Sequence, residues 1–425
     1  MNRRCGLWLA TAIYFILLVA FLLVFGYTPT NDTDAYIELA EVCLAHHDIY
    51  PSAFLFKGVP FIWHLGPINM LILSLKWFSS LMPLLVFYCL LKAFTAFFIV
   101  KISDLFFPTR IGNIVFLMYV LYLNNWGMST TMLSEVPMIC FLMMGLYFVL
   151  SSQQLISVVL AGVALAVANW FRPIAGIFLI ALLIWFLLFQ RRNLLRKWMP
   201  LVATYAIVLC LIGFNSYLRT GHFIYQGNSF WYNMADDCYD GATPDPHFGE
   251  ELYKKGTPRY IENREQLTCF ECEEIWRERC TEWLSTHKME YLKKMPYRLF
   301  YMYQNDIDFI TAFLPEKSIA EKNYVTLPLR SLSTAYASLT ATQWVALMAT
   351  GCYVLLLFLS LMGSLQLVRR REWQFLTLAY LIIIGGTLGT ILLVQGETRF
   401  KAPYMAWFFL LAAAAFIKKN EHLSK

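Results

Sequence analysis

A small set of ionisable residues stands inside or beside long apolar runs of this 425-residue chain, and these residues could do chemistry. The set comprises Asp32, Asp34, His64, Glu135, Arg172, Glu397, Arg399 and Lys401. An ionisable residue inside a membrane span costs on the order of 3 kcal/mol, so each one is a functional hypothesis. The set holds both acids and bases, which is what acid-base catalysis at a membrane surface needs.

Each of these residues also has a purely structural explanation. Asp34 would cap a helix, and Glu135 would pair with an arginine inside the helix bundle. Arg172, Arg399 and Lys401 would be interfacial anchors whose charged ends reach water. If each residue had its own structural role, acids and bases would not be expected at the same depth in the membrane. The topology below places all of them at one depth. That coincidence favours a shared site.

The elements that position these residues must be membrane helices. The chain is 59% hydrophobic and 17% aromatic, with only 15% charged residues, and its mean hydropathy is +0.54. These values indicate an all-α polytopic membrane protein, because helices satisfy their own backbone groups in lipid. The first apolar run, 7–26, is long for a signal peptide and is expected to be retained as a span.

Basic clusters orient the predicted helices. Four clusters, "MNRR", "RRNLLRK", "VRRRE" and "KKNEHLSK", are expected on the cytoplasmic side. Ten spans satisfy all four clusters: 7–26, 83–103, 111–124, 131–150, 154–171, 173–190, 199–217, 342–367, 373–394 and 402–417. Segments 28–82 and 218–340 then lie outside. The chain divides into a transmembrane module with the first outer loop (1–217), a large outer loop (218–340) and C-terminal transmembrane helices (341–425).

The apolar stretch 61–78 is one crossing too many for this topology. It contains Gly66, Pro67 and Lys76, and it is expected to lie in the outer interface as a surface or re-entrant helix. If it crosses, the count becomes eleven and a neighbouring span is wrong. All eight candidate residues then lie near the outer ends of spans, whereas a transporter is expected to place polar groups near the midplane.

The outer segments carry helical signals of their own. In "DAYIELAEVCL" an apolar stripe of Tyr36, Ala40, Cys43 and Leu44 predicts a short amphipathic helix. The loop 218–340 begins with irregular, turn-rich sequence, and from 262 to 303 its spacing predicts helices, the last of them interfacial.

Four cysteines of the large outer loop, Cys238, Cys269, Cys272 and Cys280, could form disulfides in an oxidising compartment. A zinc site from Cys269, Cys272 and Cys280 is the alternative, but the two regular ligand pairs typical of such sites are missing.

The net charge of +6 does not indicate a nucleic-acid partner. Residues 218–340 hold 14 Lys and Arg against 18 Asp and Glu, which leaves 20 against 10 for the rest of the chain. Excess basic charge in the membrane-embedded part is typical of short cytoplasmic loops. The expected location is the plasma (inner) membrane, with the lipid bilayer as surroundings and the site facing the extracytoplasmic side.

The motifs resemble those of a known family, the lipid-dependent glycosyltransferases of the C superfamily. The similarity is to the bacterial branch that resembles protein O-mannosyltransferases and the lipid A aminoarabinose transferase. It rests on "DTDAYIELAEVCL", "WHLGPINMLIL", "LSEVPMICFL", "ANWFRPIAGIFLI", "NSFWYNMADDCYDGATPD", "CEEIWRERCTEWLSTHKMEYLKKMPYRLFYMY" and "ETRFKAPYMAWFFLLAA", in the family's order over nearly the whole chain. The chain departs from the family in having one proline after His64 and Phe400 where Tyr is commoner.

The resemblance implies a glycosyltransferase fold with juxtamembrane helices in two outer loops. It also implies transfer of a sugar from a polyprenyl-phosphate donor to an acceptor hydroxyl, with inversion if one base promotes direct displacement. Asp34 is the expected base, with Asp32 as the alternative, because a carboxylate can accept the hydroxyl proton. Arg399 and Arg172, assisted by Lys401, are expected to bind the donor phosphate.

The remaining roles stay open at the level of the sequence. Glu135, His64 and Glu397 are expected to bind substrate, and Glu135 with Asp34 could instead hold a divalent cation. The acceptor is a glycolipid, a glycan or a protein, with the first two favoured. A transporter of lipid-linked sugar is the alternative function, and a non-catalytic assembly component is a further one.

Overall fold

The computed structural model describes residues 3–239, 255–257, 259–313, 341–393 and 396–418. These residues form an all-α protein without β-strands, apart from an isolated bridge between Lys57 and Thr268. The larger helices are α1 (Arg3–Phe25), α2 (Asn31–Ala45), α3 (Leu65–Phe78), α4 (Met82–Phe106), α5 (Thr109–Leu121), α7 (Glu135–Ser151), α8 (Leu155–Phe171), α9 (Ala175–Phe189), α10 (Met199–Thr220), α12 (Cys269–Lys293), α13 (Met295–Tyr303), α15 (Ala341–Arg369), α16 (Trp373–Leu393) and α17 (Ala402–Ala414). Two short helices are α6 (Leu123–Met128) and α11 (Phe230–Met234).

Among the described residues, five helical segments are long and apolar enough to cross a membrane. They are Cys5–Phe25, Met82–Phe106, Arg191–Thr220, Gln343–Arg369 and Trp373–Leu393. Five further apolar helices, α3, α5, α7, α8 and α9, have 10–17 residues. A 17-residue helix is about 26 Å long and is therefore short for a hydrocarbon layer of ~30 Å. Each of the ten expected spans coincides with a helix, but α5 and α17 end three residues earlier than the apolar pattern does.

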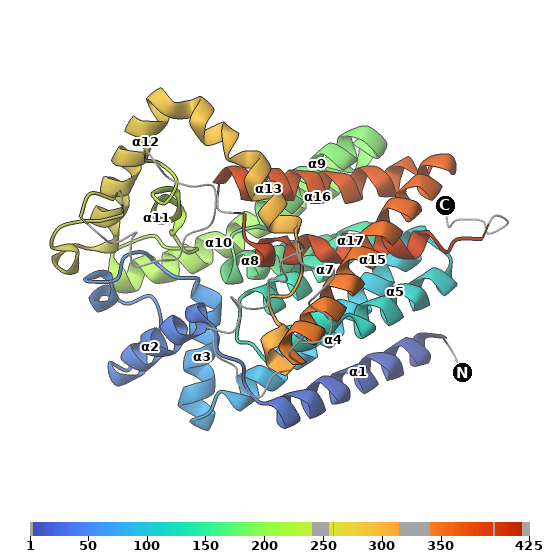
Figure 1. The fold of residues 1–425 in the computed structure, drawn as a ribbon, viewed down its shortest axis with the longest axis horizontal. Helices are drawn as coiled ribbons and strands as arrows, with labels where there is room; N and C mark the ends of the chain where they lie inside the picture. The colour runs from blue at the N-terminus through green and yellow to red at the C-terminus, as the bar shows by residue number, and fades with distance from the viewer. Residues whose placement is uncertain (1–2, 240–254, 258, 314–340, 394–395, 419–425) are drawn as a thin grey trace, which may run out of the picture.

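The helices pack as one bundle around a continuous hydrophobic core. Helix α7 packs against α4 and α8, α8 against α10, and α17 against α5 and α15. In Figure 1 helices α2, α3, α11 and α12 gather at one end of the bundle, which we call the loop end, while α1 begins and α17 finishes at the opposite end. The two long segments between spans, 28–82 and 218–340, thus place their described helices at the same end.

Helix α3 is the element that the sequence could not place. It ends at Ser79, whose φ of +51° is left-handed. In Figure 1 it runs across the direction shared by α1, α4 and α5. Its Gly66 packs tightly on the Phe171 ring at the end of α8, because a Cβ at position 66 would lie 2.8 Å from a ring carbon. This contact fixes the start of α3, and His64 with it, beside the end of α8.

The amphipathic helix expected in the first outer loop is α2. Tyr36, Ala40 and Cys43 of the expected stripe are 0–1% exposed, and Leu44, the fourth member, is half-buried against the same core. The helix packs on α3. Its N-cap is Thr30, whose backbone N–H donates to the Thr33 hydroxyl at 2.9 Å. The explanation of Asp34 as the helix cap is therefore wrong.

The long segment 218–340, expected to be the large outer loop, is helical where the sequence predicted helices, in α12 and α13. Together with α11 it builds a small second core around the fully buried Trp276. Backbone and side-chain hydrogen bonds tie this loop to the first one: the Gly58 N–H donates to the Leu267 carbonyl at 3.4 Å, and the Ile62 N–H donates to Asn228 Oδ1 at 2.5 Å. The loop end is thus a single packed layer.

Candidate active site

Five ends of helices meet at the loop end, and each brings one ionisable side chain. Asp32 lies in the first turn of α2, His64 precedes α3, and Glu135 is the first residue of α7. Arg172 follows the last residue of α8, and Arg399 lies in the 3-10 turn Thr398–Lys401 before α17. A carboxylate at a helix N-terminus is favoured by the helix dipole, which suits Asp32 and Glu135.

Arg399 connects two carboxylates. Its Nη1 lies 2.6 Å from Asp32 Oδ2, and its Nε lies 2.8 Å from Glu397 Oε2. The Asp32 and Arg399 side chains are 22% and 23% exposed, so both are reachable by a ligand. The pair joins residues 367 positions apart in the chain, and it brings the expected phosphate ligand to an expected base.

Arg172 forms the second ion pair of the site, with Glu135. The Phe400 ring contacts both arginines: its centroid is 4.8 Å from the Arg172 guanidinium carbon and 5.5 Å from that of Arg399. A cation over a ring face is attracted by the ring quadrupole. Phe400 therefore holds both guanidinium groups near one another without providing a negative charge of its own.

His64 faces the same cluster with a polar atom unused. Its Nδ1 is buried and has no hydrogen-bond partner among the described residues. Burial, and then the positive charge of Arg172, lower the pKa of His64 to about 4, so the imidazole is neutral near pH 7. Gly227 approaches it closely, because a Cβ at that position would lie 2.9 Å from Nδ1. A neutral, unpartnered imidazole is suited to hydrogen bonding a ligand.

The carboxylates of the cluster have opposite pKa shifts. For Asp32 burial acts to raise the pKa, but the charge and hydrogen bond of Arg399 overcome burial, so the pKa lies below its usual value. For Glu397 burial dominates over Arg399, and the nearby Asp32 and Asp308 add repulsion, so the pKa is raised. Neighbouring acids whose environments separate their pKa values are typical of catalytic sites.

Asp34, the preferred base at the level of the sequence, lies apart from the cluster. Its side chain is exposed, whereas Asp32 holds Arg399. The two positions are two residues apart on α2, and about 200° of helical rotation separates them. The sequence could not choose between them because both precede the same apolar stripe. In the structure Asp32, two residues before Asp34, is the one that contacts Arg399.

Lys401 is committed to a different set of partners. It is fully buried, and its Nζ lies 2.6 Å from the Asn305 carbonyl, 2.8 Å from the Thr398 carbonyl and 2.9 Å from Asp306 Oδ1. An ammonium group has three donors, so these three oxygens occupy all of them. The geometry favours a role in holding the 3-10 turn over the phosphate role expected from the sequence.

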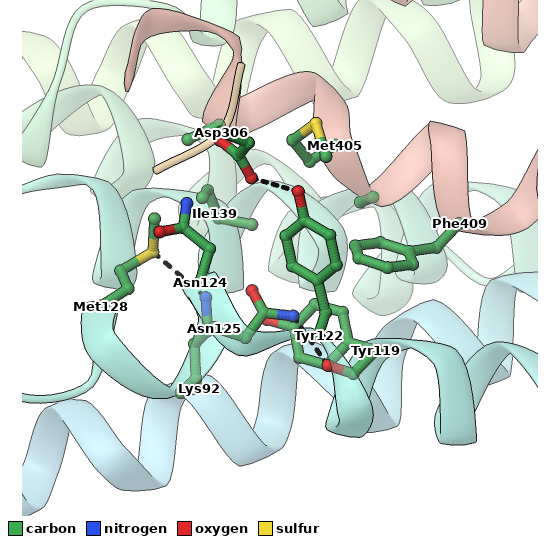
Figure 2. A pocket seen from close by; sticks show the side chains of 12 residues that line it. Lys92, Tyr119, Tyr122, Asn124, Asn125, Met128, Ile139, Asp306, Met405 and Phe409 are labelled. Carbon is green, nitrogen blue, oxygen red and sulfur yellow. Dashed lines mark hydrogen bonds between the residues drawn. The ribbon is translucent and has the colours of Figure 1, made fainter. Parts of the chain in front are cut away.

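Asp306 and Asp308 are site neighbours that the sequence reasoning missed. Asp306 pairs with Lys401 and accepts a hydrogen bond from the Tyr122 hydroxyl (Figure 2). Asp308 Oδ1 accepts from the Thr398 hydroxyl at 2.6 Å, while its Oδ2 is buried without a hydrogen-bond partner among the described residues. The sequence "QNDIDF" contains both acids and could have pointed to them. It lies inside a 123-residue loop, so the sequence alone did not show that it is close to the other candidate residues.

A small cavity lies behind the site, next to Asp306 (Figure 2). Its volume of about 20 Å³ is enough for one water molecule. The Lys92 ammonium group reaches into it from α4 and lies 3.1 Å from the Met128 sulfur. The cavity is too small for a sugar or a lipid, so it is not the substrate pocket.

The described residues offer no protein-only metal site. No group of three or more His, Cys, Asp or Glu side chains lies together closely enough to hold an ion in the part of the chain that the structure describes. The cation that Glu135 and Asp34 could hold stays a prediction, while Glu135 pairs with Arg172 in the structure.

Comparison with known proteins adds no family to this geometry. No family model, no curated protein and no solved structure matches the chain. The functional argument consequently depends on the cluster itself.

Proposed function

We propose that the protein is a membrane glycosyltransferase that moves a sugar from a polyprenyl-phosphate donor to an acceptor hydroxyl, at the loop end and on the extracytoplasmic face. The observation that carries this proposal is the Asp32–Arg399 ion pair at 2.6 Å, with both partners partly exposed. It places a potential base in contact with a potential phosphate ligand, among helices apolar enough to lie in a membrane.

In this reaction Asp32 accepts the proton of the acceptor hydroxyl as that oxygen bonds to the anomeric carbon. The bond between the anomeric carbon and the phosphate oxygen breaks, and its electron pair leaves with the lipid phosphate. Arg399 and Arg172 stabilise the negative charge that grows on the phosphate, since guanidinium groups match phosphate oxygens in shape and charge. A single displacement of this kind inverts the anomeric configuration.

Donor binding would also activate the base. In the free protein Arg399 lowers the pKa of Asp32 while burial acts in the opposite direction. A donor phosphate competes with Asp32 for the guanidinium, and once Arg399 turns to the phosphate the effect of burial remains. Asp32 then becomes more basic when the sugar is in place, which couples proton acceptance to donor binding.

The other side chains would orient the substrates. Glu135 pairs with Arg172. Two atoms have no hydrogen-bond partner among the described residues and could bind sugar hydroxyls: His64 Nδ1, as donor or acceptor, and Asp308 Oδ2, as acceptor. The acceptor is a glycolipid, a glycan or a protein hydroxyl.

The test is transfer of radiolabelled sugar from a panel of polyprenyl-phosphate sugars in proteoliposomes. Asp32→Asn is expected to lower kcat by about 10²–10⁴-fold because it removes the base. Arg399→Ala should lower it by about 10²–10³-fold through loss of charge stabilisation. Glu38→Gln, which changes an exposed carboxylate on the same helix, is the matched control and should retain full transfer.

Three outcomes would change the proposal. Loss of transfer in Asp34→Asn with full activity in Asp32→Asn would make Asp34 the base. Equal activity in all variants would remove the ion pair from catalysis. Movement of labelled carrier lipid across the bilayer without any glycosylated product would instead support the transporter function.

A further inference from the structure

The second core of the protein brings two cysteines together. Cys238 lies just after α11, Cys280 lies in the middle of α12, and both are buried, at 3% and 0% exposure. Both are free thiols in the structure, and they lie close enough for Cys238 to affect the ionisation of Cys280. The two residues are far apart in the loop sequence, so their contact is a feature of the folded loop.

The turn that carries Cys238 is held in place by its two preceding residues. Asp236 pairs with Arg259, and Asp237 pairs with Arg298 of α13. The Asp237 carbonyl also accepts a hydrogen bond from Lys294 Nζ at 2.7 Å. Buried ion pairs of this kind define one arrangement of the chain, so the approach of Cys238 to α12 is fixed by neighbours on both sides.

The pairs of cysteines within α12 are poorly placed to bond. Cys272 and Cys280 are eight residues apart on α12, which separates their Cα atoms by about 12 Å, beyond the ~7 Å limit for a disulfide. Cys269 packs into the core of the bundle, whereas Cys272 packs into the core of the loop. These two side chains therefore point to different cores.

We propose that Cys238 and Cys280 form a disulfide in the mature protein. The inference rests on the proposed function in one respect, that the loop faces the oxidising, extracytoplasmic side. A disulfide-carrying oxidant supplies the chemistry: one thiolate attacks the oxidant's disulfide, and the second thiolate then displaces the oxidant as its dithiol. Two thiol protons are released, and two electrons pass to the oxidant.

Both thiols are buried, so an oxidant can reach them only before the loop core closes, and the bond is expected to form at that stage. The neighbouring Cys238 thiol, and burial after it, also raise the pKa of the Cys280 thiol far above its usual value. Little Cys280 thiolate is then present in the folded, reduced protein, and the thiolate is the reactive form. Once formed, the bond ties α11 to α12 next to the ion pairs that anchor α13.

The test maps disulfides in protein purified from membranes, with free thiols blocked in denaturant at the moment of lysis. Cleavage after Lys and Arg puts Cys238, Cys272 and Cys280 on three different peptides, because Lys254 and Arg264 follow Cys238 and Arg277 and Arg279 lie between Cys272 and Cys280. Cys269 shares the peptide of Cys272. The expected result is one peptide pair joined through Cys238 and Cys280, with the other eight of the ten cysteines blocked.

Variants separate this bond from alternatives. Cys272→Ser, which removes a buried thiol of the same core, should leave the link intact, while Cys238→Ser should leave Cys280 blocked. Reductant should lower the thermal midpoint of the wild type and leave that of Cys238→Ser unchanged. Blocked Cys238 and Cys280 in the wild type, or a link to other partners, would overturn the proposal. The map needs no transfer assay, so a mapped bond in an inactive protein would count against the proposed function alone.

Discussion

At the scale of single residues, the ion-pair partners of the charged side chains determine which of them can bind a substrate. The Arg399 guanidinium contacts both Asp32 and Glu397 and remains partly exposed. The Lys401 ammonium group is buried and contacts three oxygen atoms of the protein. A phosphate can therefore reach Arg399 by displacing a carboxylate, but it can reach Lys401 only by dismantling the turn that carries Arg399. The difference in exposure between Arg399 and Lys401 therefore decides which of them can bind a phosphate, more than the difference between arginine and lysine does.

His64 should make stability depend on pH. Its folded pKa of about 4 lies below the usual 6.5, so the folded state resists protonation and stability falls as the pH drops from about 6.5 toward 4. The loss should reach about 2–3 kcal/mol at pH 4. Glu397, whose pKa is raised, acts in the opposite direction, and the comparison with His64→Gln isolates the histidine.

The measurement is the thermal midpoint in detergent at several pH values between 7 and 4. His64→Gln should flatten the decline. Parallel curves for the wild type and the variant would show that the imidazole does not carry this pH dependence.

Lys401→Met should destabilise the protein rather than weaken donor binding alone. It leaves Asp306, which is 5% exposed, without its ion-pair partner, so that the Tyr122 hydroxyl is its remaining hydrogen-bond donor among the described side chains. Breaking a buried pair from one side costs about 3–5 kcal/mol. Adding Asp306→Asn should recover part of the loss, which a double-mutant cycle of unfolding free energies would reveal. A raised donor KM at unchanged stability would instead restore the phosphate role of Lys401.

At the scale of elements, much of the fold could be predicted from the sequence. Apolar runs located ten helices, the stripe of Tyr36, Ala40 and Cys43 located α2, and helical spacing located α12 and α13. These signals are local, with periods of a few residues. The partner of Arg399 could not be predicted, since Asp32 and Asp34 carry the same local signal and the choice depends on how α2 docks near the start of α17.

The contact between α6 and the segment after α13 is an element-scale feature that can be tested. A Cβ at Gly127 would lie 1.9 Å from the Phe309 carbonyl oxygen, and a backbone atom cannot move aside cheaply. Gly127→Ala should therefore displace the segment that carries Asp306 and Asp308. We expect a loss of about 1–3 kcal/mol in unfolding free energy, together with lower transfer activity.

Gly176→Ala is the matched control for this change. Gly176 lies in α9, and a Cβ there would meet no atom within 4 Å. Alanine is the better helix former by roughly 0.5–1 kcal/mol, so the control should be neutral or stabilising. A tolerated Gly127→Ala, with full activity, would show that the segment can shift without affecting the site.

At the scale of the whole molecule, the loop end is a layer anchored on the bundle. Arg298 Nη1 donates to the Ile391 carbonyl at 2.7 Å, and the Tyr291 hydroxyl donates to the Leu392 carbonyl at 2.5 Å. Both bonds fasten the large outer loop to the last residues of α16, shortly before the turn that carries Arg399. The loop core is thus connected to the site through α16, and we expect substitutions of Arg298 or Tyr291 to lower activity as well as stability.

The orientation of α3 decides how the whole chain is threaded through the membrane. The helix has 14 residues and lies across the bundle, so we expect it to stay at the outer surface, with its exposed Lys76 on the same side as Glu38 of α2. Cysteines placed singly at 38, 76 and 192, in a background with Cys5, Cys210 and Cys352 replaced by serine, report this with a membrane-impermeant maleimide on intact cells. Positions 38 and 76 should react at once, and position 192, in the basic cluster between α9 and α10, only after the cells are opened. Reaction at position 76 only after the cells are opened would mean that α3 crosses the membrane. In that case one of the shorter helices α5, α7, α8 and α9 would have to stay on one side. Otherwise "RRNLLRK" would lie outside the cell.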